Sequence, residues 1–167
     1  TALNAVNSIY NAGLINGDAT VLKAVQIDNE GTGRIYGTAL ALQADTLNNR
    51  PDAAGKAPVI AARERLDIGV TTLNNLANTA DYDSQALILS AGDFYLGGAL
   101  DQNHQAAGTA QTINNAGARI EALGDLYFSA QQVNNSNANF DSDLVLVDAE
   151  TGLVKEYRGG WKTFDGQ

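Results

Sequence analysis

The stretch that decides the fold runs from residue 120 to residue 135: Ile120-Glu121-Ala122-Leu123-Gly124-Asp125-Leu126-Tyr127-Phe128-Ser129-Ala130, followed at a short distance by Val133-Asn134-Asn135. Its apolar residues alternate with small or polar residues, and glycine or asparagine separates one apolar run from the next. Such short runs of period two between turn residues predict strands of about three to five residues joined by tight turns.

The phrase that closes this stretch returns along the chain. It consists of an aliphatic residue followed by Asn-Asn or Asp-Asn, and its closest copies repeat at a spacing of about 20 residues, which predicts a solenoid. The copies are Ile27-Asp28-Asn29, Leu47-Asn48-Asn49, Leu73-Asn74-Asn75, Ile113-Asn114-Asn115 and Val133-Asn134-Asn135.

The longer distances between copies indicate insertions. Residues 60–70 match residues 120–130, and we interpret this match as three periods of about 20 residues. We interpret the long gap between the copies at Leu73 and Ile113 as one coil with two insertions, and the gap between those at Leu47 and Leu73 as one coil with one. The prediction is a repeat segment of about six coils over residues 1–140, with insertions near 50–58, 76–85 and 97–112.

A unit of this size cannot bury its apolar face alone, so successive units must stack. The predicted fold is therefore all-β, a parallel β-helix in which each coil adds about 4.8 Å along the axis. Its predicted core comprises Ile35, Leu40, Leu42, Leu47, Ile60, Leu66, Ile68, Leu73, Ile88, Phe94, Leu96, Ile120, Leu126, Phe128 and Val133.

The second asparagine of each pair is predicted to occupy one corner of the coil. Asparagine tolerates left-handed backbone conformations, and its amide can bond to backbone groups at a turn. At the same corner of successive coils, each amide can also bond to the next. The predicted structural ladder is Asn29, Asn49, Asn75, Asn115 and Asn135.

Residues 141–167 depart from the repeat. Two apolar runs, 144–147 and 153–157, flank residues 148–152 and indicate a β-hairpin. The open end of a stack has unpaired strand edges, so we predict that this hairpin caps it.

Composition excludes several classes of partner. The formal net charge is −9, from 19 acidic and 10 basic residues, which disfavours nucleic acid and anionic membranes. No stretch approaches the roughly 20 apolar residues of a membrane-spanning helix, so no membrane insertion is expected. The chain lacks cysteine and begins at Thr1, and we expect it to be a segment of a longer protein.

The residues needed for catalysis or metal binding are not gathered in the sequence. Asp18, Asp93 and Asp125 recur at one step of the repeat, but Thr38 and Arg65 interrupt their column, so we predict no metal site. His104 is the single histidine and lies in a polar insertion without a nearby catalytic partner. We therefore predict no enzymatic activity and no cofactor.

The repeat allows two other interpretations. A β-helical polysaccharide lyase or hydrolase remains the alternative, and it requires clustered carboxylates with a basic residue on one exposed sheet. A leucine-rich-repeat module requires Leu-x-x-Leu-x-Leu-x-x-Asn in successive units, a spacing that the Leu-Asn-Asn phrase does not supply.

The insertions are the places where a binding function is expected, because loops held by a rigid frame commonly carry binding residues. The candidate partner-binding residues are Tyr82, Asp83, Asp101, His104 and Gln105.

The segment 118–130, with Ile113-Asn114-Asn115-Ala116-Gly117 before it and Val133-Asn134-Asn135 after it, resembles the repeats of filamentous haemagglutinins. These are large exoproteins of bacterial two-partner secretion, and they include contact-dependent growth inhibition toxins. The resemblance covers about residues 6–140. It implies a right-handed β-helical filament, export by an outer-membrane two-partner secretion transporter, and a secreted location at the Gram-negative cell surface. It also implies a role as an adhesive or toxin-presenting stalk, with a receptor or glycan on a target cell as a candidate partner.

Overall fold

The computed structural model describes residues 1–77 and 84–137, and this part of the chain is all-β. The predicted hairpin cap at 141–167 lies outside the described residues, as do Tyr82 and Asp83. The strands are β1 (Ala2–Asn4), β2 (Ser8–Asn11), β3 (Leu14–Lys23), β4 (Gln26–Glu30), β5 (Arg34–Arg50), β6 (Val59–Leu76), β7 (Leu87–Ser90), β8 (Asp93–Gly97), β9 (Ala99–Leu100), β10 (Ala106–Ala107), β11 (Ala110–Ala116), β12 (Arg119–Ala122), β13 (Leu126–Phe128) and β14 (Ala130–Ser136).

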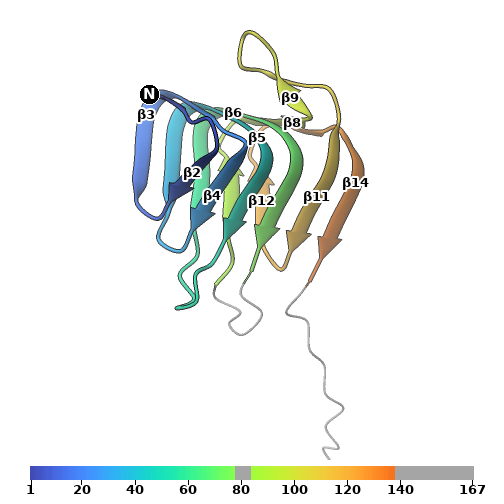
Figure 1. Ribbon diagram of the computed structural model, residues 1–167. Helices are drawn as coiled ribbons and strands as arrows, with labels where there is room; N and C mark the ends of the chain where they lie inside the picture. The colour runs from blue at the N-terminus through green and yellow to red at the C-terminus, as the bar shows by residue number, and fades with distance from the viewer. Residues whose placement is uncertain (78–83, 138–167) are drawn as a thin grey trace, which may run out of the picture.

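All of these strands except β9 and β10 belong to one sheet, whose pairings are parallel (Figure 1). The chain passes through successive coils that lie side by side in this sheet, an arrangement consistent with a parallel β-solenoid. We number the coils from the N-terminus: β1–β2, β3–β4, β5, β6, then β7 with β8 and β11, then β12 with β13 and β14.

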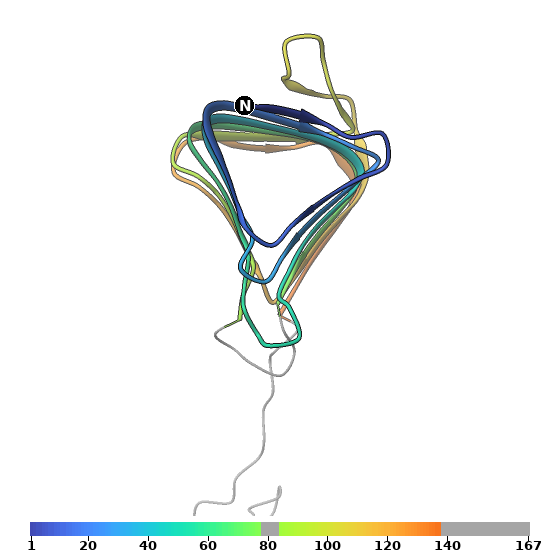
Figure 2. The ribbon, with the colours of Figure 1, turned by 60° about the vertical axis from the view of Figure 1, so that its left-hand side comes forward.

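Viewed along the stack, the coils trace a triangle (Figure 2). Side 1 holds β7, β12 and the first parts of β3, β5 and β6. Side 2 holds β1, β8, β13, the last part of β3 and the middle parts of β5 and β6. Side 3 holds β2, β4, β11, β14 and the ends of β5 and β6. The long strands β5 and β6 therefore bend around the corners rather than crossing a flat sheet.

Alternation along each side puts aliphatic residues inside the triangle, because successive side chains of a strand point to opposite faces. On side 1, Ile35, Ile60 and Ile88 stack in register and are fully buried. On side 2, Leu66 and Phe94 stack in register, and the ring of Phe94 meets that of Phe128 edge to face at 5.4 Å. The buried cluster runs through coils 2 to 5 and consists of Leu22, Ile27, Ile35, Leu40, Leu42, Ala44, Leu47, Ile60, Ala62, Leu66, Ile68, Val70, Leu73, Ile88, Phe94, Leu96, Ala110 and Ile113.

Two of the predicted core residues are not buried. Leu126 is 47% exposed and Val133 is 52% exposed, while Ile120 and Phe128 are partly buried against the core cluster. All four belong to coil 6. Within residues 1–77 and 84–137, no strand pairs with the far edge of that coil, so its inward side chains are covered on one side only.

The coils differ in length, as the pairings along side 1 show. Ile15 pairs with Ile35, Ile35 with Ile60, Ile60 with Ile88, and Ile88 with Ile120. On side 1 the shift between paired residues therefore grows from each coil to the next, and the pairing of β5 with β6 is irregular between Gly37 and Ala39. The interpretation of residues 60–70 and 120–130 as three periods apart is wrong: they lie two coils apart, and residues 77–86 and 98–109 supply the excess.

Candidate functional site

The five asparagines named from the sequence form one hydrogen-bonded column with Asn11 at its start. Each Nδ2 donates to the Oδ1 of the next member, from coil 1 to coil 6, at 2.8–2.9 Å. The second Nδ2 hydrogen goes to a backbone carbonyl at 3.0–3.3 Å. Asn29, Asn49 and Asn75 are completely buried, and their amide nitrogens are satisfied without water, as buried polar groups require. We call this column the inner ladder.

The other position of the Asn pair forms a second column on the outer face, because neighbouring strand residues point to opposite faces. Its bonds run the other way: Asn134 donates to Asn114, Asn114 to Asn74, Asn74 to Asn48, and Asn48 to Asp28, each at 2.8 Å. Asp28 also accepts a bond from Gln26. A carboxylate can only accept, so Asp28 belongs at the acceptor end of this outer ladder and determines its direction.

Reasoning from the sequence missed Asn11 and the whole outer ladder. The signal for Asn11 was present, since Ile9-Tyr10-Asn11 pairs residue by residue with Ile27-Asp28-Asn29. Tyr10 occupies the middle position, so this copy lacks the Asn-Asn or Asp-Asn pair that marks the others. Both ladders serve the same purpose, which is to hold neighbouring coils in register.

The largest departure from the stack is the hairpin of β9 and β10, at the corner between sides 2 and 3 (Figure 2). It folds back over the outer face of side 2 and bonds to two earlier coils. The amide of Leu100 donates to Oε1 of Gln43 in coil 3, and that of Ala106 donates to Oδ1 of Asp67 in coil 4. A side chain at Gly69 would collide with the backbone of Ala99, so this glycine lets the hairpin lie against the sheet.

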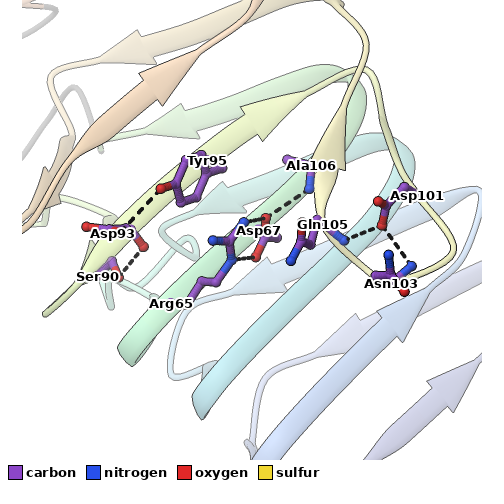
Figure 3. Close-up of polar contacts among 9 residues, drawn as sticks. All are labelled: Arg65, Asp67, Ser90, Asp93, Tyr95, Asp101, Asn103, Gln105 and Ala106. Carbon is purple, nitrogen blue, oxygen red and sulfur yellow. Dashed lines mark hydrogen bonds and ion pairs between the residues drawn. The ribbon is translucent and has the colours of Figure 1, made fainter.

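Asp67 points outward yet is only 4% exposed, because the hairpin and Arg65 cover it (Figure 3). Arg65 bonds to it with two nitrogens, Nε at 2.6 Å and Nη2 at 2.9 Å. A bidentate pair of this kind has a defined geometry and neutralises the buried charge. The bond to Asp67 raises the pKa of Arg65 above its ordinary value, despite opposing desolvation. Sequence reasoning placed Arg65 only as an interruption of the aspartate column and did not predict this pair.

Two tyrosines extend the contacts of the Arg65–Asp67 pair toward coil 6. The guanidinium of Arg65 lies 4.1 Å from the ring centre of Tyr95, a cation–π contact. The rings of Tyr95 and Tyr127 stack at 5.1 Å with a 6° interplanar angle. The pKa of Tyr95 is raised, first by desolvation and then by the charge of Asp93, to which its hydroxyl donates a bond at 3.3 Å.

The tip of the hairpin carries three of the candidate binding residues. Oδ1 of Asp101 accepts bonds from the backbone amides of Asn103 and Gln105 at 2.8 and 2.9 Å, so Asp101 builds the turn. His104 has a positive φ of 61°, and it is exposed together with Asn103 and Gln105. The structure thus brings Asp101, His104 and Gln105 together in one turn.

A cavity of about 210 Å³ lies between this tip and side 2. We call it the tip cavity. Its floor includes Ala19, Ala39 and Ala41, its wall includes Arg65 and Asp67, and its rim consists of Asn103, His104 and Gln105.

Asp18, Asp93 and Asp125, which recur at one step of the repeat, do not gather into a metal site in the described part of the chain. Asp93 pairs in register with Arg65, and its Oδ1 accepts the backbone amide of Asp125 at 2.9 Å. In the described part of the chain, no group of three or more His, Asp or Glu residues is placed to hold a metal ion. Nor does any helix among those residues have the length and hydropathy needed to cross a membrane.

Comparison of the chain with protein-family models, with curated proteins and with solved structures found no match.

Proposed function

We propose that this chain is a non-enzymatic, extracellular segment of a filamentous haemagglutinin-like adhesin or contact-dependent growth inhibition exoprotein. In this proposal the coils form a right-handed β-helical stalk, and residues 141–167 cap it. The full-length protein is exported by an outer-membrane two-partner secretion transporter and lies at the surface of a Gram-negative bacterium. The segment extends the filament and presents the hairpin to a receptor or glycan on a target cell.

One observation carries the presentation part of the proposal: the hairpin is held rigidly outside a regular stack. A stalk that only provides length has no need of a projection whose backbone amides are bonded to Gln43 and Asp67. Natural binding sites are commonly loops positioned by a rigid scaffold. The exposed tip side chains have the required access, because the turn is closed by Asp101 rather than by them.

The two ladders support the stalk part. From coil 2 onward, each coil is tied to the next by one side-chain hydrogen bond of the inner ladder and one of the outer ladder. The two columns point in opposite directions, so their amide dipoles oppose each other and do not accumulate along the filament. This construction can be extended coil by coil, as a filament requires.

The test is binding of the full chain to intact bacterial and host cells, measured by flow cytometry. A triple variant, Asn103→Ala with His104→Gly and Gln105→Ala, removes the tip side chains but retains the turn made by Asp101. We expect it to lose at least about tenfold in affinity, as removal of a binding hot spot does. The matched control is Lys56→Ala, an exposed change at another corner of the triangle, which should bind normally.

A second arm deletes residues 78–83, which contain the candidates Tyr82 and Asp83. Loss of binding in this arm alone would transfer the presenting role from the hairpin to that insertion. If the wild-type chain binds no cell type, the presentation part of the proposal is wrong and only the stalk part stands. Glycan cleavage by the purified chain would instead support the β-helical carbohydrate-active enzyme.

A further inference from the structure

The tip cavity combines a floor of small apolar side chains with a polar rim. Ala19 and Ala39 pair in register on the outer face of side 2, and they contribute methyl groups on a flat surface. Ala41 lies beneath the hairpin and is 7% exposed. A small apolar group of a ligand can therefore enter beneath the hairpin tip and rest on this floor.

Several polar groups around this floor have no hydrogen-bond partner within the described residues. Arg65 is not one of them, because its Nε and Nη2 hold Asp67 and its guanidinium lies over the ring of Tyr95. The backbone amides of Asn103 and Gln105 bond to Asp101, but the side chains of Asn103, His104 and Gln105 make no bond to the described part of the chain. The cavity thus offers amide donors and acceptors at its rim.

Charge and size restrict the ligand. The Arg65–Asp67 pair is neutral as a unit, and the chain carries a net charge of −9, so an anionic ligand is disfavoured. The volume of about 210 Å³ is below that of sites for drug-sized molecules. It suits one functional group of a larger molecule rather than an extended segment.

A peptide strand is also disfavoured at this site. The outward-facing amides of the hairpin at Leu100 and Ala106 are already bonded to Gln43 and Asp67. An incoming strand could not use them to extend the hairpin by β-augmentation.

We propose that the tip cavity binds the acetamido group of a neutral N-acetylhexosamine. The methyl group rests on the alanine floor, the carbonyl oxygen accepts a bond from the side-chain amide N–H of Asn103 or Gln105, and the N–H donates to the side-chain carbonyl of the other. The sugar hydroxyls then face the remaining rim groups, including His104. This inference rests on the proposed function, since it names the chemical group that the hairpin would recognise.

The experiment is a titration of the isotope-labelled full chain with N-acetylglucosamine, followed by backbone amide chemical shifts. We expect a dissociation constant of about 1–10 mM, typical of one small group in a shallow site. The shifts should concentrate on Ala39, Ala41 and His104. Glucose, which lacks the acetamido group, and glucosamine, which lacks the acetyl group, should bind at least about tenfold more weakly, because both lose the methyl and carbonyl contacts.

Two variants report on the site without touching the core. Ala39→Leu fills the floor at an exposed position and should abolish the shifts, whereas Ala61→Leu on side 1 should not. The triple tip variant described above should also abolish them. Circular dichroism melting curves establish that each variant is folded, and if Ala39→Leu fails this control the tip variant provides the test.

Three results would overturn the inference: no shifts at the tip cavity, equal shifts with glucose, or equal binding by both alanine variants. Equal binding of N-acetylglycinamide would overturn the assignment to a sugar and indicate recognition of a peptide acylamino group. Cell binding that depends on the tip, with no sugar binding, would leave the proposed function in place and refute this site. Sugar binding without cell binding would support the site and count against presentation to cells.

Discussion

The inner ladder makes Asn49 the most informative residue to change. Its side chain is completely buried, and it makes three hydrogen bonds: Nδ2 to Asn75 at 2.8 Å, Nδ2 to the carbonyl of Leu87 at 3.2 Å, and Oδ1 from Asn29 at 2.9 Å. Asn49→Ala removes all three, so Oδ1 of Asn75, the carbonyl of Leu87 and one Nδ2 hydrogen of Asn29 each lose this partner.

The expected loss of stability follows from these bonds. A hydrogen bond contributes about 1 kcal/mol net, and a buried polar group left without a partner costs about 1–3 kcal/mol. Since some of these partner groups can shift toward the new space, we expect a loss of about 3–5 kcal/mol in total. The control is Asn48→Ala, which removes two bonds of the half-buried outer ladder. Water can replace those bonds, so its cost should be about 1–2 kcal/mol.

Urea unfolding followed by circular dichroism measures the difference between these variants. Amide hydrogen exchange of β5 and β6 shows whether the loss is local, because stacked repeats can open separately. Equal losses for Asn49→Ala and Asn48→Ala would refute the reasoning. So would a loss below about 1 kcal/mol for Asn49→Ala, because the buried bonds would then contribute no more than exposed ones.

Three further predictions use the same contacts. Asn49→Asp should be more destabilising at pH 7 than at pH 4. The buried carboxylate faces oxygen acceptors, so its pKa in the folded state is raised above the usual value near 4, and stability is regained as the pH falls toward that value. Melting that does not depend on pH would contradict this. Gly69→Ala should displace the hairpin, because its methyl group would collide with Ala99, and limited proteolysis should then cut the hairpin faster while the core melts nearly as before. Phe94→Ala should lower the free energy of unfolding in urea by about 3–5 kcal/mol. Leu126→Ala, at a position 47% exposed, should lower it by only about 1–2 kcal/mol. Similar losses at both positions would count against this difference in burial.

Much of the repeat could be predicted from local pattern. Alternating apolar residues predicted the inward positions correctly at Leu66 and Phe94, because side-chain direction in a strand follows from sequence position alone. The same pattern failed at Leu126 and Val133. Burial there depends on whether another coil lies above, which is a property of the stack and not of the residue.

The outer face was harder to interpret. Asp67 occupies an outward position, and alternation alone would leave it in solvent. It is buried because a hairpin much later in the chain returns to bond with it through the amide of Ala106. No local signal in the sequence connects Asp67 with Ala106, so the predicted insertion near 97–112 had no predicted location on the molecule.

The Asn-Asn phrase by itself determined the period, the corner and the register of the coils, since a repeated turn residue occupies an equivalent place in each unit. Only the tertiary structure decided what the two amides of each pair do. Neighbouring residues face opposite sides of the sheet, so one pair supplies two separate columns, and Asp28, which can only accept, determines the direction of the outer one. The position of the hairpin over side 2 was likewise a matter of tertiary contact, because the residues that hold it, Gln43, Asp67 and Gly69, lie in coils already complete before the hairpin begins.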